Sequence, residues 1–503
     1  MGLKSILARP IAYFTHHKLT SDARKAKDIQ NKMLLKHIDK ARSTAFGKDH
    51  HFGKIEDYED YKKAVPVRDY EQLKKYFDRV SQGEADVLWP GKPRYLAKTS
   101  GTTSGAKYIP ITSDSLPNHF GSARNAVFNF ANQSGQFSFL DGKMIFLSGS
   151  PKLTETNGIL TGRLSGISNH LIPGWVKRSQ LPSYETNTID EWEVKIDKII
   201  EETIQADMRL ISGIPPWVQM YFERILEITG AENILEVFPN FSIFVYGGVN
   251  YEPYRQTMEK LIGGKVDSVE TYPASEGFIA FQDRPGDTGM MLNINSGIFF
   301  EFIPLSELQD ENPTRLKLDQ VETDVDYALI LTSNAGLWAY DLGDTVRFIS
   351  LDPPRIQVSG RTKNYISAFG EHVIAKEVEE ALQLTSEKLN AKTVEFTVAP
   401  QVKPPEGGTP YHEWFIEFDE EPESMEDFSA QLDREMIEQN IYYKDLIDGK
   451  ILRPLVIRSM QHNAFRRFMK ARGKLGGQNK VPRLTNDRKI ADELSDFMRK
   501  TEK

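Results

Sequence analysis

The chain has 503 residues and a formal net charge of −8, with 39% hydrophobic and 27% charged residues. This length allows a large domain plus a smaller one, and the composition is that of an ordinary soluble globular protein. The acidic balance argues against a nucleic-acid scaffold, and the absence of cysteine excludes disulfides, thiolate metal sites and a cysteine nucleophile.

The first residues resemble neither a signal peptide nor a lipidation motif. Lys4 and Arg9 interrupt the apolar stretch, and Ile6 stands where a myristoylation motif has Ser or Thr. No apolar run approaches the roughly 20 residues that span a bilayer. We therefore expect a cytoplasmic monomer with no membrane or nucleic-acid partner.

Residues 20–80 are charged and are predicted to be helical, with a turn near 45–47.

A loop rich in hydroxyl groups and glycine follows within residues 98–112, KTSGTTSGAKYIPIT. Its spacing differs from that of a P-loop, and Pro110 with its β-branched neighbours favours a strand over a helix after the loop. The segment is predicted to connect two strands and close over the phosphates of ATP, or else to be a plain polar hairpin loop. The candidate phosphate contacts are Ser100, Gly101, Thr102, Thr103, Ser104, Gly105 and Lys107.

Residues 188–206 give the clearest predicted helix. Thr188 and Glu191 match a capping box. Residues 241–246 then predict a buried strand that runs into Gly247-Gly248 and a helix over about 252–262, which is the alternation of a layered α/β fold. The apolar positions that recur at helical spacing in the first helix are Trp192, Ile196, Ile199, Ile200 and Ile204.

Two prolines after Asp352 interrupt a strand pattern and suggest a boundary near 352–354. Beyond it, residues 374–389 predict an amphipathic helix, and residues 393–398, 414–418 and 455–457 predict strands. The fold class is therefore predicted to be α/β, with a large layered domain over 1–358 and a smaller α+β domain over 359–503.

Short motifs in chain order carry a resemblance to a known family. The loop at 99–107 is followed by YPASEG at 272–277, YDLGD at 340–344, GRTKNYI at 360–366 and KVPR at 480–483. Together they resemble the adenylate-forming superfamily of acyl-CoA synthetases, luciferases and adenylation domains. Within it they are most similar to the Gretchen Hagen auxin-responsive family of acyl acid amido synthetases, over nearly the whole chain. Pro273, Ala274 and Asp341 depart from that family's motifs.

The resemblance implies an adenylate-forming large domain that binds ATP and an acyl substrate, and a small mobile domain that carries a catalytic lysine. Joining a carboxylate to the α-phosphate brings two anions together, so positive charge is needed at the reacting centre. By resemblance, Glu276 is a catalytic Mg²⁺ ligand, Lys480 bridges the two anions, Tyr272 stacks on adenine and Asp344 accepts the ribose hydroxyls. The remaining implied ATP contacts are Gly248, Val249, Ser275 and Arg361, and the implied hinge is Arg361 with Lys363.

Each of these assignments has a plainer alternative. Glu276 could be a lone surface residue, Gly247-Gly248 a tight turn, and Tyr272 a core residue. Asp344 could be a turn residue, and Arg361 and Lys363 ordinary loop charges. The segment 466–483 holds seven basic and no acidic residues, so it could be a solvated basic face or bind RNA phosphates.

Three functions stay open from the sequence. The leading one is an ATP- and Mg²⁺-dependent ligase that adenylates a small-molecule carboxylic acid and transfers the acyl group to an amino-acid amine. The second is an acyl-CoA ligase with the same first step. The third is a non-catalytic nucleotide-binding relative, which the altered residues Pro273 and Ala274 permit.

Overall fold

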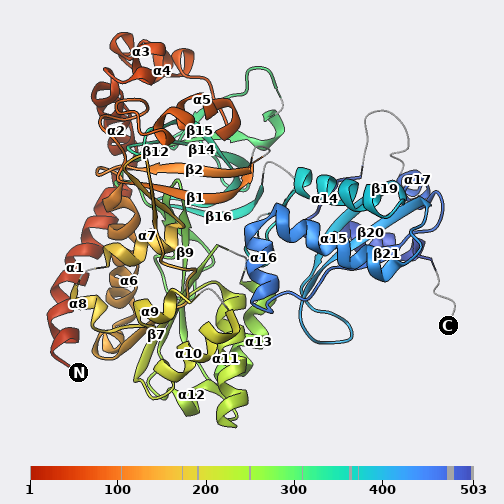
Figure 1. Ribbon diagram of the computed structural model, residues 1–503. Coiled ribbons are helices and arrows are strands. Elements are labelled where there is room, and N and C mark those ends of the chain that lie inside the picture. The colour runs from red at the N-terminus through yellow and green to blue at the C-terminus, as the bar shows by residue number, and fades with distance from the viewer. Residues whose placement is uncertain are drawn as a thin grey trace. The chain divides into compact units, whose positions relative to one another are not determined.

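The computed structural model describes residues 2–102, 105–172, 174–189, 192–248, 251–308, 310–361, 365–371, 373–472 and 481–499. The chain divides into two units (Figure 1). One consists of Met1–Thr99 and Ala106–Thr362, and the other of Ser100–Gly105 and Lys363–Lys503. None of the described helices has the length and apolar character needed to cross a membrane.

The first unit is built on a mixed sheet, which has twelve strands among the described residues. Strands β6, β3, β7, β8 and β9, in that spatial order, pair in parallel. From β9 to the opposite edge at β13 the strands pair antiparallel. From one edge to the other the order is β13 (Leu316–Lys317), β12 (Ile298–Pro304), β14 (Asp326–Ser333), β15 (Leu337–Leu351), β16 (Pro354–Arg361), β11 (Met290–Leu292), β10 (Gly277–Phe281), β9 (Asp267–Ala274), β8 (Ile243–Gly247), β7 (Met208–Ser212), β3 (Lys143–Phe146) and β6 (Gln180–Leu181).

The parallel half repeats a strand–helix–strand unit. Strand β7 leads through α11 (Pro215–Thr229) to β8, and β8 leads through α13 (Glu252–Ile262) to β9. Each helix ends at a glycine with positive φ, 69° at Gly230 and 81° at Gly263, a backbone conformation that only glycine adopts readily. The predicted strand and helix flanking Gly247-Gly248 are confirmed.

The predicted capping box is wrong at Thr188. Helix α10 begins at residue 192 (Trp192–Thr203), whereas Thr188 is the C-cap of the short helix α9 (Tyr184–Asn187). Its hydroxyl donates to the carbonyl of Glu185 at 2.7 Å, so it is already used within the preceding turn. Glu191 lies outside the described residues. The predicted core stripe is buried at Ile196, Ile199 and Ile200.

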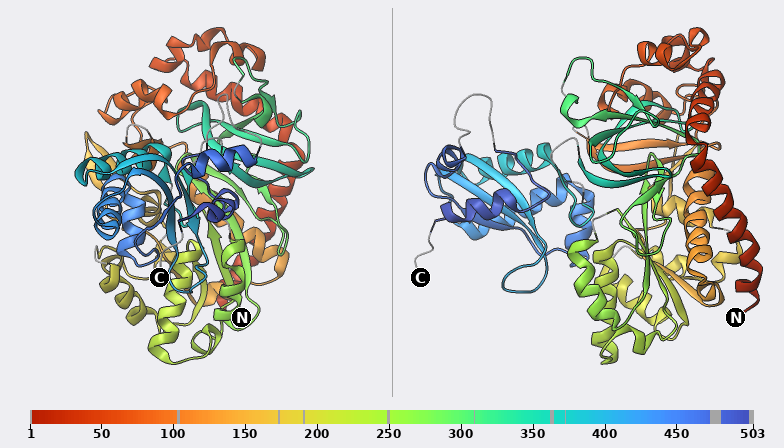
Figure 2. Two further views of the ribbon diagram at one scale, coloured as in Figure 1. Left: turned by 90° about the vertical axis from the view of Figure 1, so that its right-hand side faces the viewer. Right: turned by 180° about the vertical axis from the view of Figure 1, so that it is seen from behind.

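Helices occupy much of residues 2–81, which confirms the helical prediction for 20–80 (Figure 2). The turn lies at 42–44 rather than 45–47, because the side chain of Thr44 accepts the backbone N–H of Gly47 at 3.0 Å and so starts α3. The helices of this region are α1 (Leu3–Arg24), α2 (Ala26–Ala41), α3 (Ala45–Asp49), α4 (Tyr58–Ala64) and α5 (Tyr70–Ser81). Further helices of the first unit are α6 (Leu116–Ser134), α7 (Leu164–Leu171), α8 (Gly174–Lys177) and α12 (Ile234–Val237).

A second, four-stranded sheet contains the hydroxyl-rich segment. Its order is β2 (Gly105–Ile111), β1 (Tyr95–Thr102), β5 (Ile159–Gly162) and β4 (Thr154–Thr156). Strands therefore precede and follow residues 103–104, as predicted, and β2 rather than a helix begins directly after them.

The prolines at 353 and 354 do not end the sheet. Leu351 pairs with Pro354, so β15 and β16 form a hairpin within the twelve-stranded sheet and the prolines lie in and beside its turn. The chain passes from one unit to the other later, between Thr362 and Lys363.

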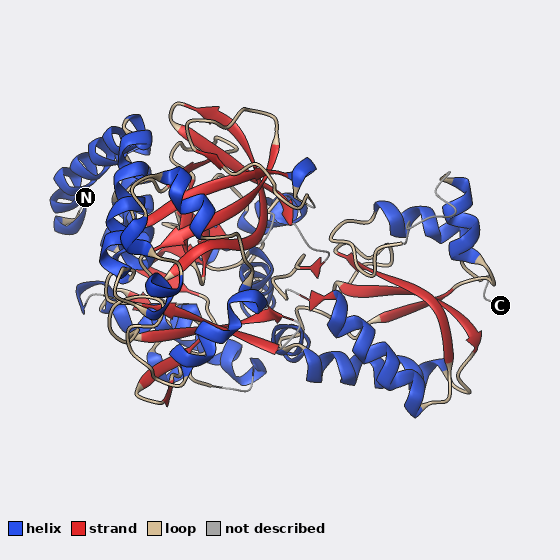
Figure 3. Cartoon of the chain, turned by 90° about the horizontal axis from the view of Figure 1, so that it is seen from above, coloured by secondary structure: helices blue, strands red, loops and turns tan. Residues whose placement is uncertain are grey.

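The second unit contains a three-stranded sheet in the order β19 (Lys392–Gln401), β20 (Tyr411–Glu420) and β21 (Val456–Ser459), with helices on both of its sides (Figure 3). The predicted helix at 374–389 and all three predicted strands are confirmed. The other elements are β17 (Tyr365–Ile366), β18 (Val373–Ile374), α14 (Ala375–Lys388), α15 (Met425–Gln439), α16 (Ile441–Asp448), α17 (Ala464–Ala471) and α18 (Lys489–Leu494).

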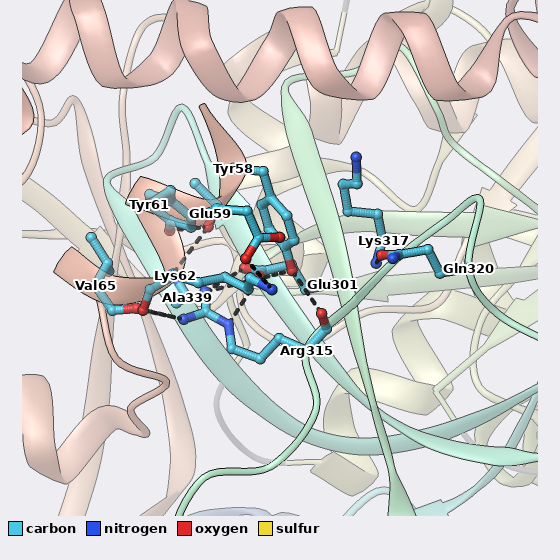
Figure 4. Close-up of polar contacts among 11 residues, drawn as sticks. Tyr58, Glu59, Tyr61, Lys62, Val65, Glu301, Arg315, Lys317, Gln320 and Ala339 are labelled. Atoms are coloured by element: carbon cyan, nitrogen blue, oxygen red, sulfur yellow. Dashed lines mark hydrogen bonds and ion pairs between the residues drawn. The ribbon is translucent and has the colours of Figure 1, made fainter. Parts of the chain in front are cut away.

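A buried ion pair ties the N-terminal helices to the main sheet (Figure 4). Arg315 Nε and Nη2 donate to the two carboxylate oxygens of Glu301 at 2.9 and 3.0 Å, and Arg315 Nη1 donates to the carbonyl of Val65 at 2.6 Å. The hydroxyl of Tyr58, on α4, donates to Glu301 Oε1 at 2.9 Å. Glu301 has no solvent exposure, so this charge depends on its partners for stabilisation.

Candidate active site

The carboxyl ends of β8 and β9 lie side by side at one edge of the main sheet. Gly247 pairs with Thr271, and a Cβ at Gly247 would overlap the carbonyl oxygen of Thr271, so the strands approach closely only because residue 247 is glycine. Gly248 continues with φ of 83° and is exposed. The carboxyl ends of parallel strands are where α/β folds bind ligands.

Ser275 and Glu276 form the two-residue turn between β9 and β10, because Ala274 pairs with Gly277. Asn118, on α6, fixes the strand that follows this turn. Its Oδ1 accepts the N–H of Phe278 at 2.7 Å, and its Nδ2 donates to the carbonyl of Phe278 at 3.2 Å. Asn118 thus positions the turn that carries Glu276, and no motif in the sequence marks it.

The side chains of Glu276, Tyr340 and Lys107, which come from separate segments, form one hydrogen-bonded chain. The hydroxyl of Tyr340, on β15, donates to Glu276 Oε1 at 3.3 Å, and Lys107 Nζ donates to the same hydroxyl at 3.5 Å. Lys107 Nζ also lies 5.9 Å from the ring centroid of Tyr70. The structure therefore brings together the predicted metal ligand and the predicted phosphate-binding lysine.

Tyr340 stays neutral in this cluster. Burial, and then the negative charge of Glu276, raise the pKa of Tyr340 well above its ordinary value. Its hydroxyl keeps its proton at neutral pH, so it can donate to the carboxylate and accept from the ammonium group at once. Tyr340 is the first residue of the YDLGD motif, but the sequence alone assigns it no part in the site.

Tyr272 and Asp344 form a second pair. The hydroxyl of Tyr272 donates to Asp344 Oδ2, and both side chains are buried. Gly343, with φ of 87°, makes the irregular step in β15 that precedes Asp344, and its N–H donates to Asp341 Oδ1 at 2.9 Å. Asp341 occupies a position where the motif of the resembled family has arginine. Here its carboxylate supports the glycine bulge beside Asp344.

Pro273 is accommodated because of where β8 ends. The last residue of β8, Gly247, pairs with Thr271, so no β8 residue needs an N–H from Pro273. On its other side Pro273 pairs with Phe278, and its side chain is exposed. This departure from the family's motif leaves the turn at Ser275 and Glu276 in place.

Several predicted site residues lie outside the described residues. These are Thr103, Ser104, Val249, Lys363 and Lys480. For five more only the backbone is described, in β1, β2 and β16: Ser100, Gly101, Thr102, Gly105 and Arg361.

The donor set around Glu276 suits a nucleotide-bound magnesium ion. Within the described ranges, no group of three or more His, Asp or Glu side chains could hold a metal on its own. Mg²⁺ usually takes one or two carboxylates and completes its shell with phosphate oxygens and water. One buried carboxylate, linked through the hydroxyl of Tyr340 to a lysine, fits that mode of binding.

The protein has a mixed α/β fold with a large N-terminal and a smaller C-terminal part, as predicted. The chain matches the GH3 family N-terminal domain over residues 15–170 and 161–266, the GH3 family central domain over 291–361 and the GH3 family C-terminal domain over 376–489. The chain belongs to the GH3 family, which confirms the resemblance.

Named relatives are distant but are covered over most of their length. An indole-3-acetic acid-amido synthetase of Arabidopsis thaliana is 22% identical, over 96% of this chain and 94% of its own. A jasmonoyl–L-amino acid synthetase of Nicotiana attenuata is 23% identical, over 75% and 77%. The solved AtGH3.15 acyl acid amido synthetase in complex with 2,4-DB superposes with a TM-score of 0.62 at 18% identity, over 98% of this chain and 96% of that one. This last likeness shows that the two proteins share a fold.

Proposed function

We propose that this protein is an ATP-dependent acyl acid amido synthetase, which adenylates a carboxylic acid and transfers the acyl group to an amino-acid amine. The observation that carries the proposal is membership of the GH3 family across its N-terminal, central and C-terminal domains, with amido synthetases among the relatives. The cluster of Glu276, Tyr340 and Lys107 supports it, because phosphate chemistry needs both kinds of charge at one place.

Each site residue has a proposed part in adenylation. The segment 100–105 and Lys107 hold the phosphates of ATP, while Tyr272, Ser275, Gly248 and Val249 surround the base and Asp344 holds the ribose. Glu276 would hold Mg²⁺, which neutralises phosphate charge when bound. Lys480 provides a compact positive charge between the acyl carboxylate and the α-phosphate. The carboxylate oxygen attacks phosphorus, pyrophosphate leaves, and the amine then displaces AMP from the acyl carbon.

The division of labour between the two parts of the chain is also proposed. Residues 1–358 bind ATP and the acid, and residues 359–503 carry Lys480. Arg361 contributes to ATP binding and, with Lys363, forms the hinge on which the small domain changes pose. The cytoplasmic location and the monomeric state stay predictions.

Pyrophosphate release with a panel of small carboxylic acids tests the proposed function. We expect release with some acids and consumption of an added amino acid with them. Release that only added CoA sustains would instead select the acyl-CoA ligase. The absence of release with every acid tried would favour a non-catalytic nucleotide-binding protein.

Replacing Thr102 and Lys107 together by alanine should weaken ATP binding or adenylation by about tenfold or more. The double variant removes a charge and a hydroxyl from the proposed phosphate contacts, and loop hydroxyls and a loop lysine generally add little to a core. ATP–pyrophosphate exchange checks the effect, and the thermal midpoint should stay at the wild-type value. Exchange equal to wild type would contradict the assignment of this loop to ATP.

Replacing Glu276 by glutamine should raise the Mg²⁺ concentration needed for half-maximal activity by about tenfold or more. Glutamine keeps the size of the side chain and an oxygen ligand but removes the negative charge that favours a cation. Activity should recover in part at high Mg²⁺. The matched control is Asp267→Asn, which neutralises a carboxylate at the opposite end of β9, where its side chain accepts a hydrogen bond from Gln136. An unchanged metal dependence in Glu276→Gln would show that Glu276 is not a ligand.

A further inference from the structure

The N-terminal helix α1 exposes an unusual number of large apolar side chains. They are Ile6, Leu7, Ile11, Tyr13 and Phe14, each between 49% and 69% exposed. Spacings of three, four and seven residues relate most of them, so they form one stripe along the helix. Figure 2 shows α1 at the outer margin of the first unit, in red.

The opposite face of α1 carries small side chains that are buried. Ser5, Ala8, Ala12 and Ala23 have at most 6% exposure, and the alanines pack with residues of α6 in the core. A helix that served only to cover the core would place large apolar residues inward and polar ones outward. In α1 Leu19 packs against the core, but the five large apolar residues named above face outward, and exposed apolar patches of this kind mark interaction surfaces.

Basic residues accompany the stripe. Residues 3–25, which form α1 and its C-cap, contain five Lys and Arg and one Asp, in a chain whose net charge is −8. Lys18 and Lys25 follow Ile11 at intervals of seven, so the apolar stripe passes into an exposed basic one on the same face. A partner for this face should therefore be apolar at its centre and negatively charged around it.

We propose that α1 docks on the surface of an anionic phospholipid bilayer. The helix would lie in the plane of the interface, with Leu7, Ile11 and Phe14 in the acyl boundary and the lysines at the lipid phosphates. A second copy of α1 fits less well, because two positively charged faces would repel each other. The expectation of no membrane partner, drawn from the sequence, does not hold under this proposal, which is independent of the catalytic one.

Co-sedimentation of the full chain with vesicles tests the proposal. Binding should be strong to phosphatidylcholine vesicles that contain 30% phosphatidylserine, weak to pure phosphatidylcholine, and reduced by salt. Replacing Leu7, Ile11 and Phe14 by glutamine should reduce the partition coefficient by about 100- to 1,000-fold, because each half-exposed side chain contributes roughly a factor of five to ten on entering lipid.

The matched control replaces Ile228, Leu305 and Leu351 by glutamine, since these apolar side chains of the same unit are 41–49% exposed. It should bind vesicles as wild type does. Lys18→Glu with Lys25→Glu should abolish the preference for phosphatidylserine without removing any apolar group. All variants should keep the wild-type thermal midpoint and pyrophosphate release in the absence of vesicles.

Two results would overturn the proposal. One is absence of wild-type binding to the anionic vesicles, or binding that the triple variant retains in full. The other is a wild-type dimer in analytical ultracentrifugation that the triple variant converts to a monomer, which would make a second copy the occupant of this face.

Discussion

Replacing Lys480 by alanine should reduce acyl-adenylate formation by about 100- to 1,000-fold. A charge placed where negative charge accumulates in the transition state typically contributes this much per donor. Lys480 lies outside the described residues, and the prediction rests on its resemblance to the lysine of the K-x-P-R motif. ATP–pyrophosphate exchange with an accepted acid measures the loss.

The matched control is Lys470→Ala, which removes an exposed lysine of α17 from the same basic run. It should leave exchange within about twofold of wild type, because exposed charges on a solvated face contribute little. Acyl transfer from chemically made acyl-AMP to an amine should also stay near normal in Lys480→Ala. Equal impairment of both half-reactions would show that Lys480 is structural or shared, and would remove the main support for two alternating poses.

Replacing Glu301 by alanine should destabilise the first unit by about 3–5 kcal/mol. The change leaves Arg315 buried without its carboxylate, and an uncompensated buried charge costs this much. Because Arg315 also donates to Val65, we expect loosening at α4 as well as at β12. The urea midpoint, with hydrogen exchange of peptides from α4 and β12, measures the effect.

The ion pair of Lys198 and Glu201 provides the contrast, because both side chains are exposed. Lys198→Ala should leave the urea midpoint unchanged. Replacing Glu301 and Arg315 together by leucine and methionine should cost less than Glu301→Ala, since no buried charge remains. A Glu301→Ala protein as stable as wild type would show that Arg315 finds another partner or water.

Local sequence signals predicted most of the secondary structure. Strand β8 and helix α13 were predictable because Gly247-Gly248 separates an apolar run from a helical one. The capping box failed because Thr188 bonds backward to Glu185, and a pattern of residue types cannot tell which of two adjacent helices uses a hydroxyl. The prolines at 353 and 354 suggested a boundary because a sequence does not show which strands pair across a turn.

The site was predictable only in part, and for a different reason. Motifs pointed to Glu276, Asp344 and Lys107 one at a time. Their arrangement depends on contacts between distant segments, such as Lys107 with Tyr340, 233 positions apart, which leave no local pattern. Asn118, which holds Phe278 from 160 positions away, has no sequence signal for the same reason.

Product analysis tests the central proposal most directly. The wild-type protein is incubated with ATP, Mg²⁺, an acid that supports pyrophosphate release, a mixture of amino acids and CoA, and the products are identified by mass spectrometry. We predict an N-acyl amino acid formed together with AMP and pyrophosphate, whether or not CoA is present. Formation of acyl-CoA with no acyl amide would contradict the assignment as an acyl acid amido synthetase.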